Sequence, residues 1–195
     1  MNFTDAWLPL ANLAGAYLAY ANFTRANLAE AVLTTTNLFR ADFTEANFAG
    51  ADLSHAESGA IFTGASLGEA NLTEVRFIGA HLTDANLRRA NLTRAVLRDA
   101  HLTGADLSRA NLTGTNLRDA HLTDAELTEA ILDGADLTTR NGPGIGPLRR
   151  AGRKTSARAD SAVAMQMVTT LATKPLPGQP CGPMLVAGVV PAACP

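Results

Sequence analysis

The chain repeats itself every five residues, and this period limits the folds open to it. From Phe3 to Leu137, with one step shortened near residue 58, the same position holds Leu or Phe in 27 of 28 repeats. Two residues earlier the chain has Ala in 24 of 28 repeats, and the residue between is Asn or Asp in 15. The unit is therefore Ala, then Asn or Asp, then Leu or Phe, followed by two variable residues.

Neither an α-helix nor a straight β-strand can bury every fifth residue on one face. Successive leucines of a helix would lie about 140° apart, because five residues at 100° each advance 500°. A straight strand would send alternate leucines to opposite faces, since the period is odd. The chain must therefore turn after each unit, so that units become the sides of a closed coil. Residues 91–110 and 111–130 nearly repeat each other, and this longer period of 20 predicts four sides per coil.

A chain of A(D/N)Lxx units resembles the pentapeptide repeat family, and the resemblance covers residues 1–139. It implies an all-β fold, a right-handed quadrilateral β-helix with the Leu or Phe and the preceding Ala inside. Coils stacked at about 4.8 Å would number about seven and make a rod of roughly 30 to 35 Å. One side of the predicted core, called side 1 below, contains Phe3, Phe23, Phe43, Phe62, Leu82, Leu102 and Leu122.

The residue types of the unit agree with such a coil. Four large side chains meet near the axis in each layer, so the second inward position must be small, and Ala fits there. Val75 and Thr115 replace that Ala and are expected to press on their neighbours. Asn and Asp suit corners, because their side chains bond nearby backbone and tolerate unusual dihedral angles.

One residue is missing around Ser58, which also breaks the Leu or Phe rule. We interpret the gap as a simple corner deletion, with a recognition loop as the alternative. If the register survives the gap, the side 1 phenylalanines form one continuous stack.

The C-terminal part differs from the repeats in composition and charge. Residues 1–139 hold 17 acids and 9 bases, a net charge of −8, whereas residues 140–195 hold 1 acid and 7 bases, a net charge of +6. Residues 140–158 are predicted to be a basic linker. In the tail, residues 159–195, apolar spacing predicts a short helix at 160–173. That helix is either a cap or dimer contact on the last coil, which would make the protein a homodimer, or an isolated segment.

We expect no catalytic residue, no cofactor and no metal site in this chain. His81, His101 and His121 recur with the longer period and should form a column. Zinc needs ligand atoms that converge at about 2.0 to 2.1 Å, while column residues point outward in parallel at about 4.8 Å. A packed solenoid offers no cleft for a catalytic group. Catalysis, metal binding and ice binding by the regular threonine columns stay as minor alternatives.

The outward positions of side 1 are acidic at neutral pH, and Arg25 is their one Arg or Lys residue. We call the following residues the acidic strip and take them as the candidate interaction surface: Asp42, Glu45, His81, Asp84, His101, His121 and Asp124. The neighbouring sides carry both signs of charge. Arg98 with Asp99 and Arg118 with Asp119 are expected to form solvated ion pairs that contribute little each.

These features favour a non-catalytic protein-interaction solenoid with an unknown protein partner. The alternative comes from the resemblance, because family members that confer quinolone resistance imitate DNA and engage DNA gyrase or topoisomerase IV. The near-neutral net charge of −2 over the whole chain argues against a globally basic nucleic-acid binder, and we expect no direct nucleic-acid binding by the solenoid. The sequence shows neither a membrane span nor a secretory signal, so we expect a cytoplasmic protein.

Overall fold

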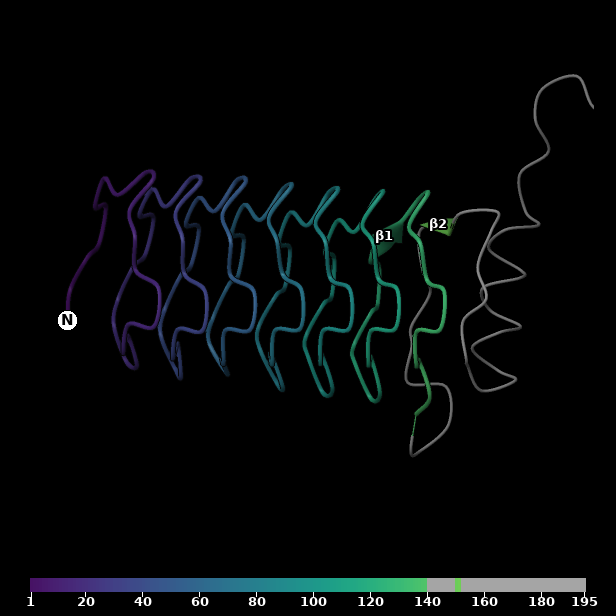
Figure 1. Ribbon diagram of the computed structural model, residues 1–195. Coiled ribbons are helices and arrows are strands. Elements are labelled where there is room, and N and C mark those ends of the chain that lie inside the picture. The colour runs from purple at the N-terminus through teal and green to yellow at the C-terminus, as the bar shows by residue number, and fades with distance from the viewer. Residues whose placement is uncertain (140–149, 152–195) are drawn as a thin grey trace, which may run out of the picture.

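The computed structural model describes residues 1–139 and 150–151. The chain winds as a stack of coils along one axis, with its N-terminus at one end (Figure 1). Parallel bridges join each unit to the fourth unit after it, as between Asn91 and Asn111. A coil therefore has four sides, each one unit long, as the longer period predicted. We number the sides 1 to 4 in chain order.

Two short strands lie at the C-terminal end of the stack. Strand β1, Glu126–Leu127, pairs in parallel with strand β2, Arg150–Ala151, and Glu126 lies opposite Arg150. Strand β2 falls within the predicted basic linker. The other residues of that linker, 140–149 and 152–158, and the predicted helix at 160–173 lie outside the described residues.

Hydrogen bonds between coils explain why this unit can stack. Around Phe23, the amides of Asn22, Phe23 and Arg25 donate to carbonyl oxygens of neighbouring coils at 2.7 to 2.9 Å. The amide of Ala26 donates to the carbonyl of Phe23 at 2.9 Å and closes the turn. The amide of Thr24 donates to Oδ1 of Asn22 at 2.9 Å. All five backbone donors of the unit are thus satisfied, one of them by the Asn side chain.

The left-handed residue of each corner lies two positions after the Leu or Phe. Arg25 has φ 57° and Gly50 has φ 66°, as the third position of a type II turn requires. For a non-glycine residue this conformation costs about 1 kcal/mol, which the bond from its amide to the next coil offsets. The expectation that Asn and Asp occupy the corners was therefore wrong. They lie in the bridged part of the side, where their Oδ1 reaches a nearby amide.

The core is a continuous column of Leu, Phe and Ala. On side 1 the rings of Phe3, Phe23, Phe43 and Phe62 stack with centroids 4.6, 5.0 and 5.1 Å apart. Leu82, Leu102 and Leu122 continue the same column, each at most 1% exposed. Phe3 is only partly buried, because it lies in the first coil. The predicted side 1 core is confirmed, and its stack crosses the deletion.

Four larger residues replace the inward Ala; Met1 is exposed, and the three buried ones fit in different ways. The turn bond from the Val75 amide to Leu72 lengthens to 3.4 Å, and the bond from the Thr36 amide lengthens to 3.3 Å. The amide of Thr115 keeps a 3.0 Å bond, and its hydroxyl donates to the carbonyl of Leu92 in the preceding coil at 2.7 Å. The prediction that the larger side chain presses on its neighbours therefore agrees with the longer turn bond at Val75, and it does not hold at Thr115.

The missing residue shortens one corner of side 4. Asn37 bridges Glu57 at the regular spacing, whereas Asp42 bridges Ile61, one position short of that spacing. Ser58 points inward at 7% exposure, and its hydroxyl accepts the amide of Ala60 at 2.7 Å. This bond takes over the role of the turn bond, so the structure agrees with a simple corner deletion.

Candidate functional site

The acidic strip lies on the outward positions of side 1. Asp42, Ile61, His81, His101 and His121 follow one another in one bridged column. Ile61 separates the acidic start of the column from its imidazole end. Glu45, Asp84 and Asp124 lie at the adjoining corner, all with left-handed backbone. The structure thus brings the whole predicted set onto one side, in two parallel columns.

The three imidazoles of the strip form a stack on the surface. The ring centroids of His81 and His101 are 4.8 Å apart and those of His101 and His121 are 4.9 Å apart, with planes within 12° of parallel. Burial lowers the pKa of His101, and the neighbouring imidazoles lower it further. Parallel rings at this spacing do not converge on a point, and within residues 1–139 and 150–151 no three His, Cys, Asp or Glu side chains are grouped to hold a metal ion.

Glycines alternate with carboxylates along the corner column of the strip. A Cβ atom at Gly64 would meet Cγ of Glu45 at 3.6 Å, and a Cβ atom at Gly104 would collide with Oδ1 of Asp84. Each acid therefore leans over the glycine of the next coil. These glycines were not recognised in the sequence, although the coil period places them in the column.

The first coils of side 1 neutralise part of its charge. Arg25 donates two hydrogen bonds to the carboxylate of Asp5 at 2.8 Å. The hydrogen bond from Arg25 holds the pKa of Asp5 below its usual range. The acidic character of the strip therefore begins at Asp42.

Arginines on the other sides pair mostly with acids of adjacent coils. Arg89 bonds to Glu69 at 3.3 Å and Arg94 to Glu74 at 3.5 Å, while Arg98 bonds to its neighbour Asp99 at 3.0 Å. All of these side chains are largely exposed, so each pair contributes about 0 to 1 kcal/mol. The expectation of solvated ion pairs is confirmed at Arg98.

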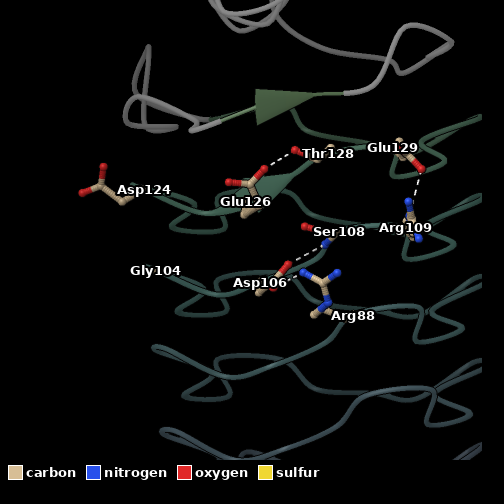
Figure 2. A pocket seen from close by; sticks show the side chains of 9 residues that line it. All are labelled: Arg88, Gly104, Asp106, Ser108, Arg109, Asp124, Glu126, Thr128 and Glu129. Carbon is tan, nitrogen blue, oxygen red and sulfur yellow. Dashed lines mark hydrogen bonds and ion pairs between the residues drawn. The ribbon is translucent and has the colours of Figure 1, made fainter.

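An open pocket that the sequence did not reveal lies on side 2, close to β1 (Figure 2). Arg88 bonds to Asp106 at 3.0 Å, and Arg109 bonds to Glu129 at 2.9 Å. Partial burial raises the pKa of Asp106, but hydrogen bonds from Ser108 and Arg88 outweigh it and leave the pKa lowered. The residues that line the pocket are Arg88, Gly104, Asp106, Ser108, Arg109, Asp124, Glu126, Thr128 and Glu129.

A small aromatic patch on side 4 was also missed. The rings of Tyr20 and Phe39 meet edge to face at 5.8 Å, and the guanidinium of Arg40 lies 5.5 Å from the Phe39 centroid. Tyr20 is 62% exposed and Phe39 47%. The sequence could have revealed this patch, because Tyr20 and Phe39 both occupy outward positions of the five-residue repeat.

The described residues carry most of their polar side chains on the outward positions of the coils. In residues 1–139 and 150–151, no helix is long and apolar enough to cross a membrane. The inward positions are filled by apolar side chains except at Thr36, Ser58 and Thr115, and the other polar groups lie in ladders on the outside. Such an arrangement can recognise a surface through many evenly spaced contacts.

Comparison with known proteins agrees with this architecture. The family model for pentapeptide repeats matches eight copies, over residues 2–34, 36–57, 60–99 and 100–138. No curated protein matches the chain significantly.

Several solved structures are similar to the chain. HetL, a pentapeptide repeat protein involved in heterocyst differentiation regulation in Nostoc sp. strain PCC 7120, is 32% identical, with 82% of each chain covered and a TM-score of 0.34. A pentapeptide repeat protein of the Arabidopsis thaliana thylakoid lumen is 28% identical over 57% of this chain and 77% of its own, with a TM-score of 0.52. Trypsin-treated QnrB1, a plasmid-mediated fluoroquinolone resistance protein, is 20% identical over 82% of each chain, with a TM-score of 0.51.

Proposed function

The chain belongs to the pentapeptide repeat family, and from that premise we propose that it is a non-catalytic interaction solenoid that presents ladders of polar side chains to a protein partner. The solenoid is taken as about seven right-handed coils, a rod of roughly 30 to 35 Å. It uses no cofactor and carries out no reaction. Its partner is a protein with a basic surface, and recognition takes place without direct contact between the solenoid and nucleic acid.

The observation that carries this proposal is the acidic strip on side 1. Its ladder positions, Asp42 through His121, are held in register by bridges, so the side chains are ordered before a partner arrives. Preorganised side chains lose little entropy on binding. Rows of negative charge also speed association with a basic surface.

A second candidate function is DNA mimicry directed at DNA gyrase or topoisomerase IV. The same acidic strip favours DNA mimicry, because it lies along a rod of the fold that the DNA-mimicking family members share. The charge density of the rod favours the general interaction role over DNA mimicry. Side 1 has a net charge of −4 and the whole solenoid −8, or about one charge per 4 Å of rod, against one per about 1.7 Å in duplex DNA with both strands counted. A mimic with this density would compete weakly for a site that recognises phosphates.

A gyrase supercoiling titration separates the two candidates. The parent protein is compared with a variant that carries Asp42→Asn, Glu45→Gln, Asp84→Asn and Asp124→Asn. We expect no inhibition by either protein under the general interaction role. Inhibition by the parent and not by the variant would establish the mimic and replace our first proposal.

Partner capture tests the interaction role itself. The four-site variant is compared in cross-linking pull-downs with a matched control on side 3, Asp52→Asn with Glu74→Gln and Asp133→Asn. We expect a partner that is lost with the side 1 variant and kept with the side 3 control. Equal capture of the partner by both variants would show that the acidic strip is not part of the binding surface.

A further inference from the structure

The last coil is the most acidic coil of the solenoid. Residues 120–139 contain five acids and no Lys or Arg, a net charge of −5. Residues 80–119, which form the two coils before it, contain four acids and six arginines, a net charge of +2. The last coil therefore supplies acids but no cation of its own to this end of the rod. Its acids are Asp124, Glu126, Glu129, Asp133 and Asp136.

The end of a solenoid also leaves backbone donors that need partners. The amides of Leu107 and Arg109 donate to carbonyl oxygens of the next coil at 2.8 Å. In the last coil the equivalent donors on side 2 are Leu127 and Glu129. Strand β2 lies beside Leu127, in the place that the next coil takes elsewhere (Figure 1).

The pairing of β2 does not continue the pentapeptide frame. Regular units pair across one full coil, as Asp106 does with Glu126. Glu126 itself lies opposite Arg150, four positions beyond the partner that the frame would give it. Hence the repeat does not explain why Arg150 and Ala151 pair with the last coil. Charge offers an explanation, because residues 149–158, which we call the basic segment, hold five Arg or Lys residues and no acid.

The pocket on side 2 adjoins this pairing. Figure 2 shows Glu126 and Thr128 at its edge next to β2, with Glu129 further along. The pocket has four carboxylates and two guanidinium groups, a net charge of −2. A cationic segment that enters it would meet Glu126 and the Arg109–Glu129 pair.

We infer that the acidic last coil is a docking site for an extended, arginine-rich segment, and that its occupant is the chain's own basic segment, residues 149–158. Strand β2, which lies within this segment, pairs with the backbone edge at β1, and the segment's charge of +5 would balance the charge of −5 on the last coil. A protein partner that binds this end of the rod must displace it. The interaction proposed for side 1 shares only one acid, Asp124, with this docking site.

A charge-swap experiment on the full chain tests the docking. One variant reverses the segment, with Arg149→Glu, Arg150→Glu and Arg153→Glu. A second reverses the last coil, with Asp124→Lys, Glu126→Lys and Glu129→Lys. A third combines all six changes. Hydrogen exchange is measured at low salt for the amides of Leu127 and Glu129, with those of Leu67 and Glu69 as matched internal controls on the same side.

We expect either reversal alone to speed exchange at Leu127 and Glu129 about tenfold, and the combination to restore protection. A variant with Arg149→Lys, Arg150→Lys and Arg153→Lys keeps the positive charge and should retain the protection of both amides. The control amides should not change in any variant, which excludes general unfolding.

Three outcomes would overturn the inference: unchanged exchange in the segment variant, failure of the combined variant to recover, or protection that rises with protein concentration. The last would show that the segment of a second copy is the occupant.

Discussion

Side 1 carries stacked rings in both halves of the rod, but on opposite faces of the backbone. In the first half, Phe23, Phe43 and Phe62 stack inside the core and are at most 1% exposed. In the second half the core residues are leucines, and the rings of His81, His101 and His121 stack outside at 4.8 to 4.9 Å. The coil spacing imposes the stack in both places, because it matches the stacking distance of flat rings.

Burial decides what each stack does. A phenyl ring inside the rod removes apolar surface from water and stabilises the fold. An imidazole outside contributes less burial and can take up a proton, so it changes the charge of the surface that a partner meets. The same ladder thus contributes to stability in one half, and in the other half it belongs to the surface that we propose for recognition.

Truncating one core residue in each half should have the largest effect on stability. Phe43→Ala is expected to lower the free energy of unfolding by about 3 to 5 kcal/mol and Leu102→Ala by about 2 to 5 kcal/mol. Phe43 should lie at the upper end, because its ring also contacts Phe48 at 5.0 Å. Denaturant unfolding of the two variants measures the difference, with Phe43→Leu as the control that keeps most of the volume. A smaller loss at Phe43 than at Leu102 would show that ring stacking adds nothing to burial.

Substitutions in the outward column of side 1 should lower the stability less than core truncations do. The loss should also differ between the two halves of the rod. Oδ1 of Asp42 accepts the amide of Thr44 at 3.0 Å and its hydroxyl at 2.6 Å. Asp42→Ala should therefore cost about 1 to 2 kcal/mol, whereas His101→Ala should cost about 0.5 kcal/mol. Thermal unfolding compares them, and Asp42→Asn should retain nearly full stability because it keeps the acceptor. Equal losses in the two Ala variants would mean that the carboxylate bonds are not needed.

The smallest effect concerns pH and the imidazole stack. Burial and the two neighbouring imidazoles lower the pKa of His101, so the unfolded chain binds a proton before the folded chain does as the pH falls. The free energy of unfolding should thus decrease below about pH 6.5, until the folded-state pKa is passed. His101→Asn should remove this part of the pH dependence, as urea unfolding at pH 7.5 and 5.0 would reveal. An identical pH dependence in parent and variant would contradict a shifted His101.

Much of the site could be derived before the structure, because the period alone assigns residues to sides. The columns Asp42 to His121 and Glu45 to Asp124 follow from counting four units at a time along the chain. The leaning of Asp84 over Gly104 and the pocket beside Glu126 could not be derived in this way. They depend on side-chain directions and on contacts between residues that are distant in the sequence.

By itself, the sequence determined the coil, its four sides and the inward Leu, Phe and Ala. A five-residue unit repeats one local environment, so pattern and burial are linked at every step. Only the tertiary structure decided which residue adopts the left-handed corner, how Thr115 reaches the carbonyl of Leu92, and where β2 pairs. Each of these depends on contacts between coils, whose partners lie about 20 residues apart in the sequence, so the five-residue pattern does not reveal them.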